Sequence, residues 1–182
     1  GTNAKFNSPY GLTLSLDSTY LLISDSSNKL IRKIILSTID VSTLAGGSTS
    51  GNSNGIGTNA LFNNPYGISM SPDGAYTLIV DFSNHRIRKM IISTLEVSTF
   101  AGSSGSTNNG IGTNSKFHSP HSICISSDGV YALVTEIGFH LIRKIILSTS
   151  EVSTIAGGGT SLNGVGTNVA FNNPTDISLS SN

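Results

Sequence analysis

The sequence is poor in cysteine, tryptophan and charge: it has one cysteine, no tryptophan and only 11% charged residues. The single cysteine, Cys124, excludes a disulfide within the chain and reads as a small core residue. Because 10 basic residues balance 10 acidic ones, no basic face for nucleic acid is predicted, so DNA is not an expected partner. No apolar run approaches the ~20 residues of a membrane-spanning helix, so no span is predicted in this segment.

Glycine is frequent, with 20 residues, and serine, threonine and asparagine are abundant. Apolar residues make up 37% of the chain. This content is sufficient for a packed core and too high for a disordered chain. The mixture of β-branched, small and turn-forming residues is typical of an all-β chain with many turns.

The tripeptide Gly-Thr-Asn marks an internal repeat. It begins at Gly1, Gly57, Gly112 and Gly166, and each copy is followed by a phenylalanine and a proline. Repeats of this kind indicate an array of similar structural units. We therefore divide this single domain into repeats 1–56, 57–111 and 112–165 and a partial repeat 166–182.

Each repeat predicts four short strands. In the first repeat these are residues 10–17, 20–25, 29–36 and 41–46. The first of them alternates Leu with Ser or Thr, which is the period of a strand. Four antiparallel strands in each of several repeats predict the blades of a β-propeller. The expected fold is all-β: a β-propeller fragment of three four-stranded antiparallel blades plus the innermost strand of a fourth.

Repeat two carries a resemblance to a known family. The segment "FNNPYGISMSPDGAYTLIVDFSNHRIRKM", residues 62–90, is similar to an NHL repeat in its phenylalanine, proline, Gly-Ile, Asp-Gly and Asn-His-Arg-Ile positions. The resemblance covers the whole chain and is weakest in repeat three. It implies a propeller, often of six blades, that hosts ligand binding, RNA binding or, in some members, metal-dependent catalysis. It also favours an extracellular or cell-surface location.

Most charges occupy fixed positions in the repeat. Charges copied from blade to blade are expected to stabilise each blade by capping turns and forming ion pairs. The Asx pairs at the end of the second strand are open to two interpretations: they close a tight turn, or they line a binding face. The candidate ligand face comprises Tyr10, Asp25, Asn28, Tyr66, Asp81, Asn84, His121, Glu136 and His140.

Repeat three departs from the pattern. Glu136 replaces an aspartate, and Gly138 and Phe139 replace the Ser-Asn of the turn. Three of the four histidines also fall here. A metal site is conceivable because imidazole and carboxylate groups bind zinc, but we predict that the candidate ligands do not converge and that no cofactor is bound. These candidates are His118, His121, Glu136 and His140.

The leading functional hypothesis is a non-enzymatic binding or scaffold module with a protein, peptide or glycan ligand. The alternatives are a metal-dependent propeller hydrolase or lyase and a single-stranded RNA-binding module, which the neutral charge disfavours. We also expect the chain to be a piece of a larger propeller, because three blades leave two apolar flanks open. The remaining blades would come from the same longer chain or from a second copy.

Overall fold

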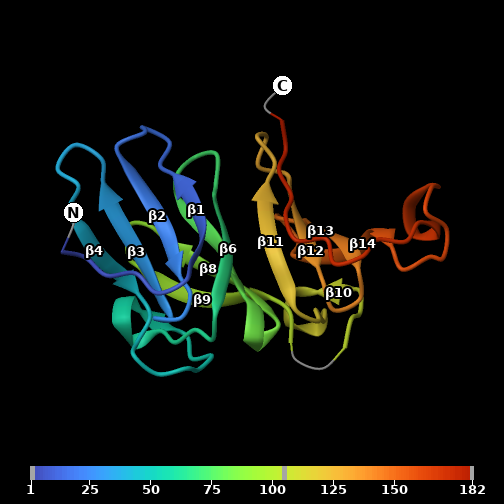
Figure 1. Cartoon of the computed structure of the whole chain (residues 1–182), viewed down its shortest axis with the longest axis horizontal. Coiled ribbons are helices and arrows are strands. Elements are labelled where there is room, and N and C mark those ends of the chain that lie inside the picture. The colour runs from blue at the N-terminus through green and yellow to red at the C-terminus, as the bar shows by residue number, and fades with distance from the viewer. Residues whose placement is uncertain (1–2, 104–105, 181–182) are drawn as a thin grey trace.

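The computed structural model describes residues 3–103 and 106–180 and is all-β. Three sheets lie side by side as blades, coloured blue, green and orange along the chain (Figure 1). Blade 1 has the strand order β1-β2-β3-β4, and blades 2 and 3 repeat this order with one further short strand each. The bounds in blade 1 are β1 (Pro9–Leu14), β2 (Tyr20–Asp25), β3 (Leu30–Ile35) and β4 (Val41–Ala45).

Blades 2 and 3 contain the equivalent strands. In blade 2 these are β6 (Pro65–Met70), β7 (Tyr76–Asp81), β8 (Arg86–Ile91) and β9 (Glu96–Ala101). In blade 3 they are β11 (Pro120–Ile125), β12 (Tyr131–Glu136), β13 (Leu141–Ile146) and β14 (Glu151–Gly157). The predicted four-stranded antiparallel blades are confirmed. Among the first strands of the blades, β6 packs against β1 on one side and against β11 on the other.

The turn after each first strand is stabilised by its aspartate. The carboxylate of Asp17 accepts hydrogen bonds from the Ser15 hydroxyl and from the Thr19 backbone N–H. The hydrogen bond from Ser15 is the largest cause that lowers the pKa of Asp17. Asp73 and Asp128 make the same contacts in the other two blades, so this column of acids has the capping role expected from its repetition.

The long connections between repeats contain structure that the sequence does not predict. The connections before blades 2 and 3 each cross to the outer edge of the blade that follows and add a two-residue strand there. Strand β5 (Gly55–Ile56) pairs with β9, and β10 (Gly110–Ile111) pairs with β14. A 3-10 turn over the Gly-Thr-Asn tripeptide follows each of these strands.

The fourth repeat differs from expectation. Its Gly-Thr-Asn also forms a 3-10 turn, η4 (Gly166–Asn168), and residues 171–180 then run beside β11 (Figure 1). These residues are not assigned to a strand. A strand needs a hydrogen-bonded neighbour, and within the described residues no later strand of a fourth blade is present to pair with them.

The apolar core lies between the blades. One cluster, which includes Leu22, Ile31, Phe62 and Ile79, joins blades 1 and 2. A second joins blades 2 and 3 around Phe117. The outward flank of blade 1 is exposed instead, with Leu12 at 67% of its full accessible surface.

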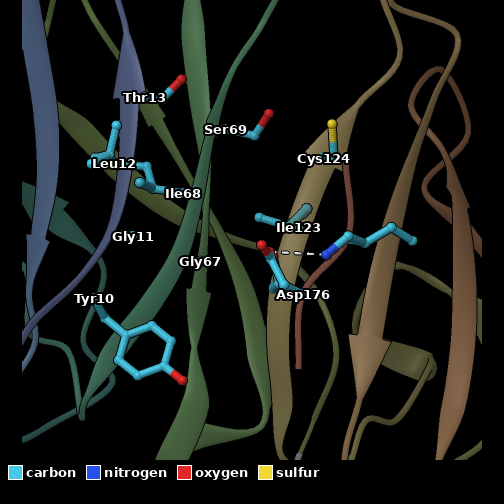
Figure 2. A pocket seen from close by; sticks show the side chains of 12 residues that line it. Tyr10, Gly11, Leu12, Thr13, Gly67, Ile68, Ser69, Ile123, Cys124 and Asp176 are labelled. Carbon is cyan, nitrogen blue, oxygen red and sulfur yellow. Dashed lines mark hydrogen bonds between the residues drawn. The ribbon is translucent and has the colours of Figure 1, made fainter. Parts of the chain in front are cut away.

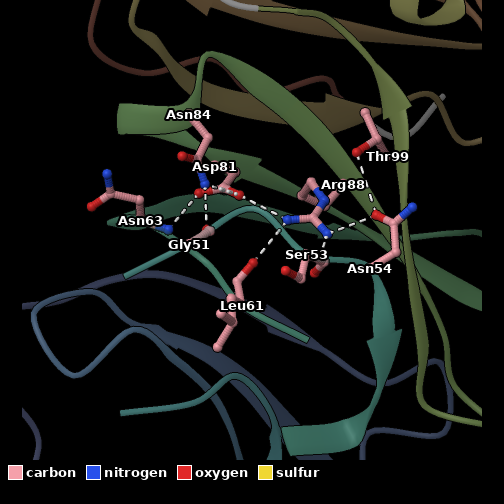
Figure 3. A network of polar contacts seen from close by, with 9 residues as sticks. All are labelled: Gly51, Ser53, Asn54, Leu61, Asn63, Asp81, Asn84, Arg88 and Thr99. Carbon is pink, nitrogen blue, oxygen red and sulfur yellow. Dashed lines mark hydrogen bonds and ion pairs between the residues drawn. The ribbon is translucent and has the colours of Figure 1, made fainter. Parts of the chain in front are cut away.

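Buried ion pairs anchor each connection to the blade that follows it. In blade 2, Arg88 pairs with Asp81 at 3.0 Å, and both side chains are fully buried. The Arg88 guanidinium also donates to the carbonyls of Leu61 and Ser53 and to the side chain of Asn54 (Figure 3). Arg143 and Glu136 form the same pair in blade 3 at 2.6 Å. The acids at the end of the second strand and the arginines that pair with them therefore stabilise the blades.

Candidate functional site at the mouth of the central opening

The innermost strands enclose a cavity of about 390 Å³. Strands β1, β6 and β11 supply most of its wall, and the segment after Phe171 closes one side (Figure 2). Because these strands repeat one sequence pattern, the same repeat positions face the cavity in each blade. The second position of the strand, Gly11, Gly67, Ser122 and Asp176, lines the cavity in every repeat. The first position, just before it, holds Tyr10, Tyr66, His121 and Thr175, of which Tyr10 lines the cavity.

The glycines of the second position allow the innermost strands to approach closely. A Cβ atom on Gly11 would lie 2.5 Å from the carbonyl oxygen of Tyr66, and one on Gly67 would lie 2.7 Å from the Cα of Ser122. Both obstacles are backbone atoms, which side-chain rotation cannot move. Glycine therefore lets the neighbouring strands lie close together, and the cavity wall at these two positions consists of backbone atoms.

An aromatic cluster supports Tyr10 at the mouth of the cavity. The rings of Tyr10 and Tyr66 stack with centroids 4.2 Å apart, and Phe82 stacks on the other face of Tyr66 at 4.4 Å. His121 meets both tyrosines edge-on. Tyr10 is 51% exposed and His121 is buried. The Tyr10 ring therefore faces solvent, and the other rings pack beneath it.

Two hydrogen bonds orient the ring of His121 and select its tautomer. Its Nδ1 lies 2.5 Å from the carbonyl oxygen of Thr175, and its Nε2 lies 2.6 Å from the hydroxyl of Tyr10. A carbonyl oxygen only accepts, so Nδ1 carries the proton and donates. In the neutral ring Nε2 is then the acceptor, and the Tyr10 hydroxyl donates to it.

The Tyr10 hydroxyl is held in its protonated form. Burial is the largest cause that raises its pKa, followed by the neighbouring Tyr66 and Asp176. A protonated phenol is a poor nucleophile and a poor base. Tyr10 therefore acts as a hydrogen-bond donor and as an aromatic surface.

Asp176 brings a carboxylate to the cavity. Its Oδ1 accepts a hydrogen bond from the Ser122 hydroxyl at 2.7 Å and from the backbone N–H of Ile177 at 2.9 Å. Among the described residues that line the cavity and its mouth, Asp176 is the only acid. Its remaining oxygen can accept hydrogen bonds from a ligand.

The structure separates the sequence-predicted ligand face into two groups. Tyr10, Tyr66 and His121 gather at the mouth. The acids Asp25, Asp81 and Glu136 are instead fully buried in ion pairs with the arginines of β3, β8 and β13. The amides of Asn28 and Asn84 donate to Asp25 and Asp81, and His140 accepts from the N–H of Asn173. This second group closes turns and joins segments.

The four candidate metal ligands each have another role in the structure. Glu136 pairs with Arg143, and His118 stacks on His85 with centroids 5.3 Å apart. His121 and His140 make the hydrogen bonds given above. In the part of the chain that is described, no three His, Cys, Asp or Glu side chains gather where they could hold a metal ion.

The altered turn of repeat three has a packing explanation. A Cβ atom on Gly138 would collide with the imidazole of His118, so the serine of the other repeats does not fit there. Phe139 contacts the same imidazole edge-on. The substitutions in this turn therefore accommodate His118 and its stack on His85.

Sequence reasoning missed Asp176, Ser122, Phe82 and the two glycines of the second position. The signal was present in the alignment of the repeats. At the second position of the first strand, the side chain changes along the four repeats from none to polar to charged. The residues are Gly11, Gly67, Ser122 and Asp176.

Comparison with known proteins supports the repeat assignment. No family model matches the chain. It is 34% identical over 103 residues, 55% of the chain, to NHL repeat-containing protein 2 of Bos taurus. It is 30% identical over 159 residues, 82% of the chain, to Protein SUPPRESSOR OF QUENCHING 1, chloroplastic, of Arabidopsis thaliana.

The repeats of this chain are NHL repeats. The matched segments span only 14% and 15% of the length of these two relatives. Solved structures show the same propeller fold at lower identity. A protein of unknown function from Bacteroides thetaiotaomicron has a TM-score of 0.76 at 22% identity, over 94% of this chain and 42% of its own. An auxiliary nutrient binding protein from the same organism has a TM-score of 0.68 at 19% identity, over 92% and 42%.

The NHL blades account for the regular structure of the described residues. Within those residues no helix has the length and apolar character required to cross a bilayer.

Proposed function

We propose that this chain is a non-enzymatic NHL-type binding module and that the mouth of its central opening binds a carbohydrate. The observation that carries the proposal is the cavity of about 390 Å³ with Tyr10 at its rim and Asp176 in its wall. This volume lies in the range of small-molecule sites.

The chemistry of the lining favours a ligand rich in hydroxyl groups. An exposed tyrosine ring offers an apolar face for the C–H face of a sugar. The Asp176 carboxylate accepts hydrogen bonds from hydroxyl groups, and such charge-assisted bonds are strong. Thr13, Ser69 and Ser122 add further hydroxyl groups around the cavity. The likeness in fold to an auxiliary nutrient binding protein is in keeping with this role.

A binding role also fits the state of the ionisable groups. Both nitrogens of His121 are engaged in hydrogen bonds, and the raised pKa of Tyr10 keeps its hydroxyl protonated. Asp176 has no second carboxylate beside it among the described lining residues, whereas glycoside hydrolysis ordinarily uses two.

Titration calorimetry of the chain against a panel of mono- and oligosaccharides tests this proposal. At least one saccharide should bind, and Asp176→Asn and Tyr10→Ala should each weaken that binding about tenfold. Asp40→Asn is the matched control, because it removes a turn carboxylate away from the mouth. The proposed ligand class is wrong if no saccharide binds, or if peptides bind in a manner that depends on Asp176. Release of products from a bound saccharide would show that the module is an enzyme.

A further inference from the structure

Each innermost strand places a short polar side chain in the wall of the cavity. The fourth position of the strand holds Thr13 in β1, Ser69 in β6 and Cys124 in β11, and all three line the cavity. Figure 2 shows these side chains at one level of the wall, with the ring of Tyr10 at the other end of the view. Their hydrogen bonds decide what this level of the wall offers to a ligand.

Hydrogen bonds between blades orient the hydroxyls of Thr13 and Ser69. The backbone N–H of Met70, in blade 2, donates to Oγ1 of Thr13 at 3.2 Å. The N–H of Ile125, in blade 3, donates to Oγ of Ser69 at 3.1 Å. Each oxygen thus accepts from the blade that follows it. In the described part of the chain neither hydroxyl donates to a protein atom, so both protons are available to a ligand.

The two hydroxyls are neighbours in space. Thr13 accepts from the N–H of Met70, which is the residue directly after Ser69. The close approach at Gly11 brings β1 and β6 together two residues earlier. A carbonyl oxygen has two lone pairs and can accept from two donors placed in this way. A ligand hydroxyl there would instead bring a proton of its own toward two donors.

Cys124 occupies the same position but does not add a third donor. Its thiol donates to the carbonyl of Ile125 at 3.7 Å, and a thiol is a weak donor. Its sulfur therefore serves as apolar surface. Ile68 and Ile123 line the cavity beside it, so the two hydroxyls have an apolar wall as their neighbour.

The charge of the cavity favours a neutral acceptor. Among the described residues that line the cavity and its mouth there is no lysine or arginine, and Asp176 supplies one negative charge. A ligand carboxylate would enter without a compensating cation and near a like charge, which is costly. An amide carbonyl offers the same acceptor oxygen without the charge.

We propose that Thr13 and Ser69 bind the acetamido carbonyl of an N-acetylated sugar, an inference that rests on the carbohydrate binding proposed above. The carbonyl oxygen accepts from both hydroxyls. The methyl group of the acetamido packs against the apolar wall of Ile68, Ile123 and Cys124. A sugar without the N-acetyl group would leave this part of the cavity unfilled.

The rest of the ligand then lies toward the mouth. The sugar ring packs on Tyr10, and its hydroxyl groups donate to Asp176. Thr13 and Ser69 are thus specificity-determining residues, whereas the groups at the mouth bind every sugar alike. A site with oriented donors discriminates against a ligand that lacks the matching acceptor, because the donors are then left without a partner.

Titration calorimetry with matched sugars tests the inference. The pairs are N-acetylglucosamine with glucose and N-acetylgalactosamine with galactose. In at least one pair the N-acetylated sugar should bind about tenfold more tightly. Ser69→Ala should remove most of this preference, whereas Ser69→Thr, which keeps a hydroxyl, should retain it. Cys124→Ala is the matched control, because it changes the same position in the same cavity and removes no donor to the ligand.

The outcomes separate this inference from the proposal on which it rests. Asp176→Asn should weaken both sugars of a pair and leave the preference between them unchanged. If sugars bind but N-acetylation gives no advantage, or if the preference survives Ser69→Ala, the role of the two hydroxyls is refuted and carbohydrate binding stands. Tighter binding of glucosamine than of N-acetylglucosamine would also refute it, since the amine would then pair with Asp176. If no saccharide binds, both proposals fail.

Discussion

The hydroxyl of Tyr10 in blade 1 lies 2.6 Å from Nε2 of His121 in blade 3, across 111 positions of sequence. The two side chains meet over the ring of Tyr66 in the blade between them. One hydrogen bond thus ties together the first and last complete blades. It does so at the mouth of the cavity to which we assign binding.

Removing the hydroxyl should test this tie. Tyr10→Phe keeps the stack on Tyr66 and loses the hydrogen bond to His121, so the free energy of unfolding should fall by about 1 kcal/mol. Urea denaturation measures the change. Tyr131→Phe is the control, because the Tyr131 hydroxyl has no hydrogen-bond partner among the described residues. Equal effects of the two substitutions would contradict a specific role for the Tyr10–His121 bond.

The stability of the fold should fall on mild acidification because of His85. Its Nδ1 accepts the backbone N–H of Ser119, which requires an unprotonated nitrogen. Burial, followed by the neighbouring His118, lowers the pKa of His85 in the folded state. Below a pH of about 6.5 the unfolded chain therefore binds more protons than the folded one. This contribution to stability is present above that pH and is lost as the pH falls from there through the lower pKa of the folded state.

Urea midpoints measured between neutral and mildly acidic pH check this expectation. His85→Gln should flatten the dependence on pH, whereas His140→Gln, at the equivalent position in blade 3, serves as the comparison. A slope that is the same in His85→Gln as in the parent chain would show that other groups cause it.

Arg88→Met should strongly destabilise the fold, because Arg88 is a buried charged residue. Burial is the largest cause that raises the pKa of Asp81 even with Arg88 beside it. Without that arginine the carboxylate is left uncompensated in the interior, at a cost of about 3–5 kcal/mol. The double variant Asp81→Asn/Arg88→Met removes both charges and should be more stable than Arg88→Met alone. Chemical denaturation of the three chains gives the comparison, and a double variant that is less stable would refute the explanation.

Gly67→Ala should strain the inner wall of the cavity. Its new methyl group would meet backbone atoms of Ser122 at 2.7 Å, and such overpacking costs about 1–3 kcal/mol. Gly51→Ala is a matched control, because its methyl group would meet only side-chain atoms of Leu61, which can move. Thermal melts should rank the parent chain first, Gly51→Ala second and Gly67→Ala last; the reverse order of the two variants would contradict the close approach of β6 and β11.

Sequence patterns predicted the blades well because each strand is specified locally. The alternation in residues 10–17 and the turn at Asp17 depend on neighbours in the chain, and the structure places a strand and a capped turn there. The repetition of the acids and arginines indicated that they form ion pairs, as Asp81 and Arg88 do. It did not indicate that Ser53 and Asn54 accept hydrogen bonds from Arg88.

The site was only partly predictable. The gathering of Tyr10, Tyr66 and His121 follows from their shared position in the repeat. The entry of Asp176 depends on where residues 171–180 settle beside β11, and nothing local in that segment specifies this. The burial of Asp25 and Asp81 was also hidden, because the atoms that surround them belong partly to loops distant in sequence.

Because each loop crosses to the next blade, the segment that folds together with a blade does not coincide with one sequence repeat. The repeat begins at Gly57, but the atoms that hold Arg88 come from Ser53 and Asn54, on the other side of that boundary. A chain shortened or lengthened by one blade should therefore be joined near Gly46 and Gly102, where a loop travels with the blade that it fastens. Cutting at the Gly-Thr-Asn boundary would separate each buried arginine from the loop residues that accept its hydrogen bonds.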